Sequence, residues 1–174
     1  LDRAIKALIG RQNASDLEAT PMLYASVTNI VDCNNQFLRY STIRRSPCFA
    51  HSLVENISGG NTMVFNRSLW ELFIGLPDRL DLISHDWTVY QLVTGAGGIV
   101  HYDSTPSINY RQHDENKLGT KFTFKGKLDR LYRFLNLTYK QEIDANINVL
   151  MKQEKHITPS NQFLLKRFQA FRQG

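Results

Sequence analysis

The sequence feature that most constrains the fold is a run of mostly apolar residues at positions 22–32, MLYASVTNIVD. Its Tyr, Val, Thr and Ile residues favour extended backbone, and polar stretches lie on both sides of it. The run therefore predicts a buried strand that ends in a turn at DCNNQ, residues 32–36. A chain of 174 residues is long enough to surround such a strand with one hydrophobic core.

The remaining patterns alternate between strand and helix early in the chain and are helical late in it. Residues 2–12 place apolar side chains on one face and predict a helix. We then expect a strand at 61–66, a helix at 69–76 capped by Ser68, a helix at 80–97 ended by Gly95, and short β runs at 98–103 and 107–113 around Pro106. Basic helical segments follow at 125–153 and 158–174.

Composition narrows the class of protein. A content of 42% hydrophobic and 21% charged residues is typical of a globular chain. The sequence contains no run of 18 apolar residues, so it predicts no membrane-spanning helix. The two cysteines, Cys33 and Cys48, lack the spacing of a zinc site. We expect both to be free thiols in a reducing compartment.

Charge is distributed unevenly along the chain. Residues 1–116 contain nine Lys and Arg against twelve Asp and Glu, whereas residues 117–174 contain twelve against four. A basic tail predicts an acidic partner, which is an anionic membrane surface, nucleic acid or another protein.

Within the last predicted helix, 158–174, the stretch 161–174 interleaves aromatic and basic residues, among them Phe163, Phe171 and Arg167. One interpretation is a basic amphipathic helix that lies on an anionic membrane leaflet. The other is a helix that packs its Phe face on the body of the protein and leaves a solvated basic face. No recognised nucleic-acid-binding module occurs in the chain, so we expect no nucleic-acid partner.

Asp86 begins an otherwise apolar helical pattern, SHDWTVYQLV at 84–93, and admits two interpretations. It is either a simple helix cap or a carboxylate that the helix N-terminus aims into a cleft. Trp87 likewise either packs in the core, or excludes water and stacks on a sugar face. His85 is expected to be a solvent-facing or hydrogen-bonded neighbour.

Two further groups are candidate binding residues. Gly59, Gly60 and Asn61 precede a predicted strand, where glycine permits a tight bend and close approach of a ligand to the backbone; the alternative is a plain turn. Arg111 and His113 alternate along YRQH and therefore lie on one side of an extended segment. Arginine suits a bidentate grip on a diphosphate and neutral histidine suits a metal, although a lone histidine is more often a surface or core residue.

Three motifs that contain these residues follow one another along the chain: SGGNTMVFNRSLWELF, then SHDWTVYQLV, then YRQH. Together they resemble the C-terminal half of a family 2 glycosyltransferase, most closely the bacterial rhamnosyltransferase-like members that build surface polysaccharides. The resemblance covers residues 1–119. It implies an α/β fold that is the acceptor-side half of a GT-A nucleotide-diphospho-sugar transferase, followed by a basic helical extension at 120–174.

The resemblance also implies an activity and its residues. The reaction is inverting transfer from a nucleotide-diphosphate sugar to a saccharide or lipid-linked saccharide, with Asp86 as the base. Residues 59–61 and Trp87 contact sugar or acceptor, Arg111 lies near the diphosphate, and His113 completes a Mg²⁺ or Mn²⁺ site. The family's Asp-x-Asp motif does not occur in these 174 residues, so we expect a fragment that is inactive alone.

Location and assembly follow as expectations. We expect a cytoplasmic protein, with peripheral attachment to the inner face of the membrane as the alternative to a free one. An open sheet edge predicts a homodimer. The rival function is a non-catalytic domain that binds a glycan, a membrane or a protein through its basic helical tail.

Overall fold

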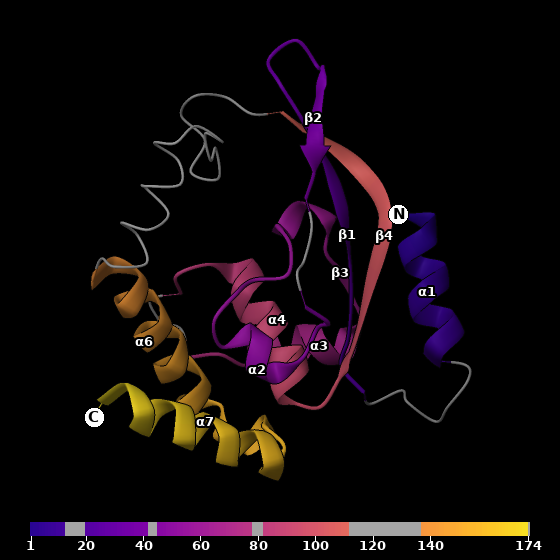
Figure 1. The fold of residues 1–174 in the computed structure, drawn as a ribbon. Helices are drawn as coiled ribbons and strands as arrows, with labels where there is room; N and C mark the ends of the chain where they lie inside the picture. Colours follow the sequence, from indigo (N-terminus) through magenta and orange to yellow (C-terminus); the bar gives the residue numbers. More distant parts are fainter. Residues whose placement is uncertain (13–19, 42–44, 78–81, 112–136, 174) are drawn as a thin grey trace.

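The computed structural model describes residues 1–12, 20–41, 45–77, 82–111 and 137–173 (Figure 1). Within these ranges the chain forms an α/β fold with a mixed four-stranded sheet and six α-helices. The elements in chain order are α1 (Asp2–Gln12), β1 (Met22–Val31), β2 (Phe37–Tyr40), α2 (Phe49–Ser52), η1 (Gly60–Thr62), β3 (Val64–Phe65), α3 (Arg67–Ile74), α4 (His85–Gly95), β4 (Ile99–Arg111), α6 (Leu137–Lys152), η2 (Glu154–His156) and α7 (Pro159–Gln173).

Strand β1 is the centre of the sheet, which confirms the strand predicted from the apolar run. It pairs in parallel with β4 along its whole length. On its other edge it pairs antiparallel with β3 near its start and with β2 near its end. All of its side chains except that of Asn29 are buried, as expected of a central strand covered on both faces.

Side-chain alternation along β1 divides the core between the two faces of the sheet. Met22 and Tyr24 pack against Ala4 and Leu8 of α1, so the helix predicted at 2–12 is confirmed and covers one face. Leu23 and Ala25 point to the other face, where they join a core made by α3 and α4. Figure 1 shows α1 alone on one side of the sheet and the remaining helices on the other.

The two short β runs expected around Pro106 are one strand. Ser26 of β1 faces Asp103 of β4, but Thr28 faces Ile108, so β4 bulges where proline supplies no N–H to the ladder. The side chain of Ser26 bonds that of Ser107 at 2.6 Å across this irregularity.

Helix α1 is tied to the bulge of β4. The guanidinium of Arg3 donates to the carbonyls of Thr105 and Pro106 and lies 3.3 Å from the Asp103 carboxylate, which also accepts from the Tyr24 hydroxyl at 2.6 Å. Burial raises the pKa of Asp103, but the hydrogen bonds from Tyr24 and Thr105 and the charge of Arg3 outweigh burial, and its pKa lies below its usual value.

The cap expected at Ser68 is wrong, because Asn66 caps α3. The side-chain Oδ1 of Asn66 accepts from the backbone N–H of Leu69 at 3.2 Å and from that of Met22 at 2.9 Å. Its amide nitrogen donates to the Thr20 carbonyl at 2.8 Å. One side chain thus satisfies a helix terminus and joins it to the start of β1.

The strand expected at 61–66 is shortened to Val64–Phe65. The Gly59 carbonyl accepts from the N–H of Thr62 at 3.1 Å and from its hydroxyl at 3.2 Å, which closes the turn η1 in place of extended backbone. The bounds expected for the helix at 80–97 are wrong: α4 runs from His85 to Gly95, and residues 82–84 before it and 96–97 after it are not helical. Its C-cap is Ala96, and the left-handed residue that follows is Gly97, with φ of 71°.

The C-terminal helices form a second cluster with the N-terminal part of α4. Leu165 of α7 and Ile143, Ile147 and Leu150 of α6 are buried against Phe49 and Trp87. Residues from both predicted parts of the chain, 1–119 and 120–174, therefore contribute to the packing around α4. No helix within the described ranges is long and apolar enough to cross a bilayer. Cys33 and Cys48 are free thiols, as expected.

Candidate functional site

Asp86 is the second residue of α4, and its carboxylate is held by three donors. Ser84, not Asp86, occupies the N-cap position, so Asp86 is not the simple cap. Oδ1 accepts from the Ser84 hydroxyl and from the Trp87 backbone N–H at 2.8 Å. Oδ2 accepts from the Gly60 backbone N–H at 3.1 Å. A carboxylate offers about four lone-pair positions, so one position on Oδ2 remains for a further donor.

Gly60 lies directly against the start of α4. A Cβ at this position would stand 3.1 Å from Nε2 of His85 and 3.4 Å from the Cβ of Asp86. The structure therefore brings together two features that are 26 residues apart and that the sequence singled out separately. The close approach of backbone to side chain explains why glycine suits this position.

The loop at 59–61 is fixed to the sheet by hydroxyl groups. The Ser58 hydroxyl bonds that of Thr62 at 2.7 Å and lies 3.3 Å from the Ser26 carbonyl of β1. Gly59 is half-buried at the N-cap of η1, and Asn61 is exposed. Ser58, Thr62 and Ser84 are site residues that local patterns did not predict; for Ser84, its position two residues before Asp86 was the available signal.

The two neighbours of Asp86 point in different directions. His85 is exposed, in agreement with the expectation of a solvent-facing residue. Trp87 is 6% exposed, and its indole N–H donates to the Ser52 carbonyl at 2.7 Å within the cluster that α6 and α7 cover. This burial favours the packing role of Trp87 over stacking on a sugar face.

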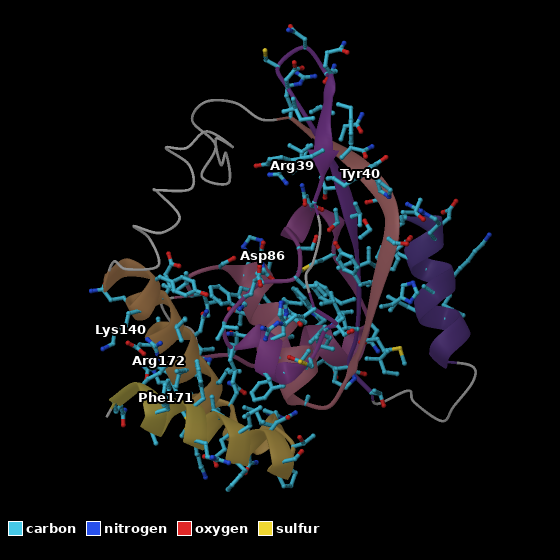
Figure 2. All side chains as sticks on the ribbon, viewed as in Figure 1. Arg39, Tyr40, Asp86, Lys140, Phe171 and Arg172 are labelled. Carbon is cyan, nitrogen blue, oxygen red and sulfur yellow. The ribbon has the colours of Figure 1, made fainter. Side chains whose placement is uncertain are left out.

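Arg111 ends β4 beside the turn at 32–36. Its Nε and Nη2 donate to the Asn35 side-chain oxygen at 3.1 and 2.8 Å. The turn itself is closed by Asp32, whose carboxylate accepts from the backbone of Asn34 and Gln36. Figure 2 shows Asp86 at the start of α4, between the sheet and the C-terminal helices. His113 lies outside the described residues.

The described residues do not fit a Mg²⁺ or Mn²⁺ site. Among them no group of three or more His, Cys, Asp and Glu side chains could hold a cation. The remaining position on Asp86 Oδ2 is a single acceptor, and hard cations require several oxygen ligands. What the arrangement can do chemically is accept one proton from a hydroxyl placed at Oδ2.

The fold and the site define an α/β protein with a mixed sheet, compatible with a Rossmann-like fold, and a carboxylate held at a helix N-terminus. No family model matches the chain, and no solved structure matches it significantly.

A comparison with curated proteins finds a similarity to the protein described as dTDP-rhamnosyl transferase RfbG from Shigella flexneri. The two are 33% identical over 70 residues, which is 40% of this chain. The matched segment spans about a quarter of the relative, 24% of its length. The chain is thus related in part to a glycosyltransferase.

Proposed function

We propose that this chain is the acceptor side of an inverting GT-A glycosyltransferase of family 2. The observation that supports the proposal best is the Asp86 carboxylate, which the Gly60 N–H and two further donors hold at the N-terminus of α4 with one acceptor position open. The partial similarity to a rhamnosyl transferase supports the same class of reaction.

The proposed chemistry is one proton transfer coupled to one displacement. Oδ2 of Asp86 takes the proton of an acceptor hydroxyl while that oxygen attacks the anomeric carbon of the donor. The bond from the anomeric carbon to the nucleotide diphosphate breaks on the opposite face, and the electron pair leaves with the diphosphate. Inversion at the anomeric carbon follows from this geometry.

The surrounding residues support the base in this scheme. The backbone N–H groups of Gly60 and Trp87 fix the orientation of the Asp86 carboxylate at the N-terminus of α4. The 59–61 loop forms the floor beneath acceptor and sugar, and Trp87 supports Asp86 from the core. Arg111 is proposed to contact the diphosphate, and His113 a cation, but no step here passes through a metal.

The proposed donor is a nucleotide-diphosphate sugar, and the acceptor is a saccharide or lipid-linked saccharide of a cell-surface polysaccharide or lipopolysaccharide precursor. dTDP-rhamnose is the first donor to test, because the relative is described as a dTDP-rhamnosyl transferase. Dimerisation through an open sheet edge and a cytoplasmic location, free or at the inner membrane face, stay predictions.

The experiment is sugar transfer by the complete gene product, with the anomeric configuration of the product read by proton NMR. The proposal expects transfer that depends on the acceptor hydroxyl and inverts the configuration of the donor. Retention of configuration would contradict a single displacement with Asp86 as base. Binding of saccharide without transfer from any nucleotide-diphosphate sugar would favour the non-catalytic alternative.

A further inference from the structure

Helix α7 exposes a continuous stripe on the side that faces away from the core. Phe163, Lys166, Arg167, Ala170 and Phe171 are all exposed, and their spacing of three and four residues places them on one helix face. We call these five residues the outer stripe. Phe163 is 63% exposed and Phe171 is 84% exposed, so both rings lie largely in solvent.

The fold already uses the opposite face of α7. Leu165 is fully buried, and Leu164 and Phe168 pack partly against the cluster formed with α6. The packing interpretation of this helix is therefore confirmed only in part, because Phe168 packs on the body whereas Phe163 and Phe171 lie outside, and the membrane interpretation stays a prediction. Two largely exposed phenylalanines on one helix face are a candidate interaction surface.

Cations accompany the exposed rings. The guanidinium of Arg167 lies over the Phe163 ring, 5.6 Å from its centroid. The Arg172 guanidinium donates to the Lys140 backbone carbonyl at 3.0 Å, so Lys140 of α6 lies near the C-terminal end of α7. Figure 2 labels Lys140, Phe171 and Arg172 in this region.

Acidic groups near the outer stripe are paired. Glu154 lies 2.5 Å from the Lys166 amine, and Asp144 lies 2.8 Å from Arg172. Residues 137–173 contain six Lys and Arg against three Asp and Glu. The segment that carries the stripe therefore has a net positive charge, and neither Arg167 nor Lys140 forms an ion pair with another described residue.

We propose that the outer stripe binds the surface of an anionic lipid bilayer. Phe163 and Phe171 are eight residues apart, so at about 1.5 Å per residue their rings enter the membrane about 12 Å from each other along a helix parallel to the surface. Arg167 and Lys140 then meet anionic headgroups, while the rings occupy the boundary between headgroups and acyl chains.

Charge favours lipid over a second copy of the chain as the occupant. In a two-fold symmetric dimer the stripe would meet itself, and Arg167, at the centre of the stripe, would face the same cation of the other copy. An anionic bilayer complements both the rings and the cations. This inference concerns where the protein binds and stands apart from the proposed sugar transfer.

The test is flotation of the protein with phosphatidylcholine vesicles that contain zero to 40% phosphatidylglycerol, roughly a physiological range of anionic lipid. Binding should appear with phosphatidylglycerol and weaken in high salt. The Phe163→Ser, Phe171→Ser double variant should lose about 10- to 100-fold in partitioning, and Arg167→Gln with Lys140→Gln about 10-fold. The matched control is Phe37→Ser with Tyr40→Ser, which removes two rings of β2 that are 55% and 53% exposed.

Each contrary result overturns the proposal. Flotation independent of phosphatidylglycerol, or reduced equally by the control and stripe variants, would show that the stripe is not the binding surface. Concentration-dependent dimers in lipid-free sedimentation that only the stripe variants abolish would assign the stripe to a second copy. All four substituted side chains are exposed, and circular dichroism confirms the fold of each variant; the charge variant provides a second test independent of the phenylalanines.

Discussion

Replacing Trp87 distinguishes a core residue from a sugar-binding one. The side chain is 6% exposed and contacts the cluster of α2, α6 and α7, so Trp87→Ala should lower the free energy of unfolding by about 3–5 kcal/mol. Trp87→Phe keeps much of the apolar surface but loses the indole N–H. The Ser52 carbonyl still accepts from Gln91 at 3.0 Å, so this loss should be only about 1–2 kcal/mol.

Urea unfolding followed by circular dichroism measures both losses, with the dependence on urea expected to be unchanged. Trp70→Phe is the control, because Trp70 is half-exposed on α3 and should change stability by less than about 1 kcal/mol. A core role for Trp87 is excluded if Trp87→Phe unfolds like the wild type while sugar transfer falls tenfold or more. That result would mean that the ring contacts substrate.

Three further predictions test the fold. Gly98→Ala should destabilise by more than about 3 kcal/mol in urea unfolding, because a Cβ there would lie 2.4 Å from the Pro21 carbonyl, whereas Gly10→Ala, with nothing within 4 Å, should be neutral or slightly stabilising. Asn66→Ala should lower the thermal midpoint through a loss of about 2–3 kcal/mol, and Asn66→Asp should lose less because it keeps the acceptor that caps α3. Because folding lowers the pKa of Asp103, the ionised carboxylate stabilises the fold at pH values above the ordinary aspartate pKa of about 3.9, and this stabilisation is lost as pH falls below that value. The difference in the free energy of unfolding between wild type and Asp103→Asn should therefore vanish in acid. A difference that persists at pH 2 would contradict the ion pair with Arg3.

Local patterns predicted the elements whose residues decide their own structure. The buried strand, the helix at 2–12 and the helix that begins near Asp86 were predicted because their apolar spacing fits one backbone period. The exposure of Phe163 and Phe171 was not predicted, because the spacing along the helix does not say which of its aromatic residues the body of the protein covers.

Long-range contacts could not be predicted from local patterns. Asn66 rather than Ser68 caps α3 because it also bonds the start of β1, a contact across 44 residues. The β4 strand continues through Pro106 because β1 pairs with it on both sides of the bulge. The bond between Gly60 and Asp86 depends in the same way on a turn, η1, and a helix start, α4, that only the folded chain brings together.

Whether Asp86 is the base is tested most directly by the rate of sugar transfer by Asp86→Asn in the complete gene product, beside Ser84→Ala and wild type. We predict a loss on the order of a hundredfold or more for Asp86→Asn with nucleotide affinity retained, and a smaller loss of about tenfold for Ser84→Ala, which removes one donor to the carboxylate. Transfer by Asp86→Asn within a few-fold of wild type would exclude a general base at this position and would make Asp86 a structural residue that joins the 59–61 loop to α4.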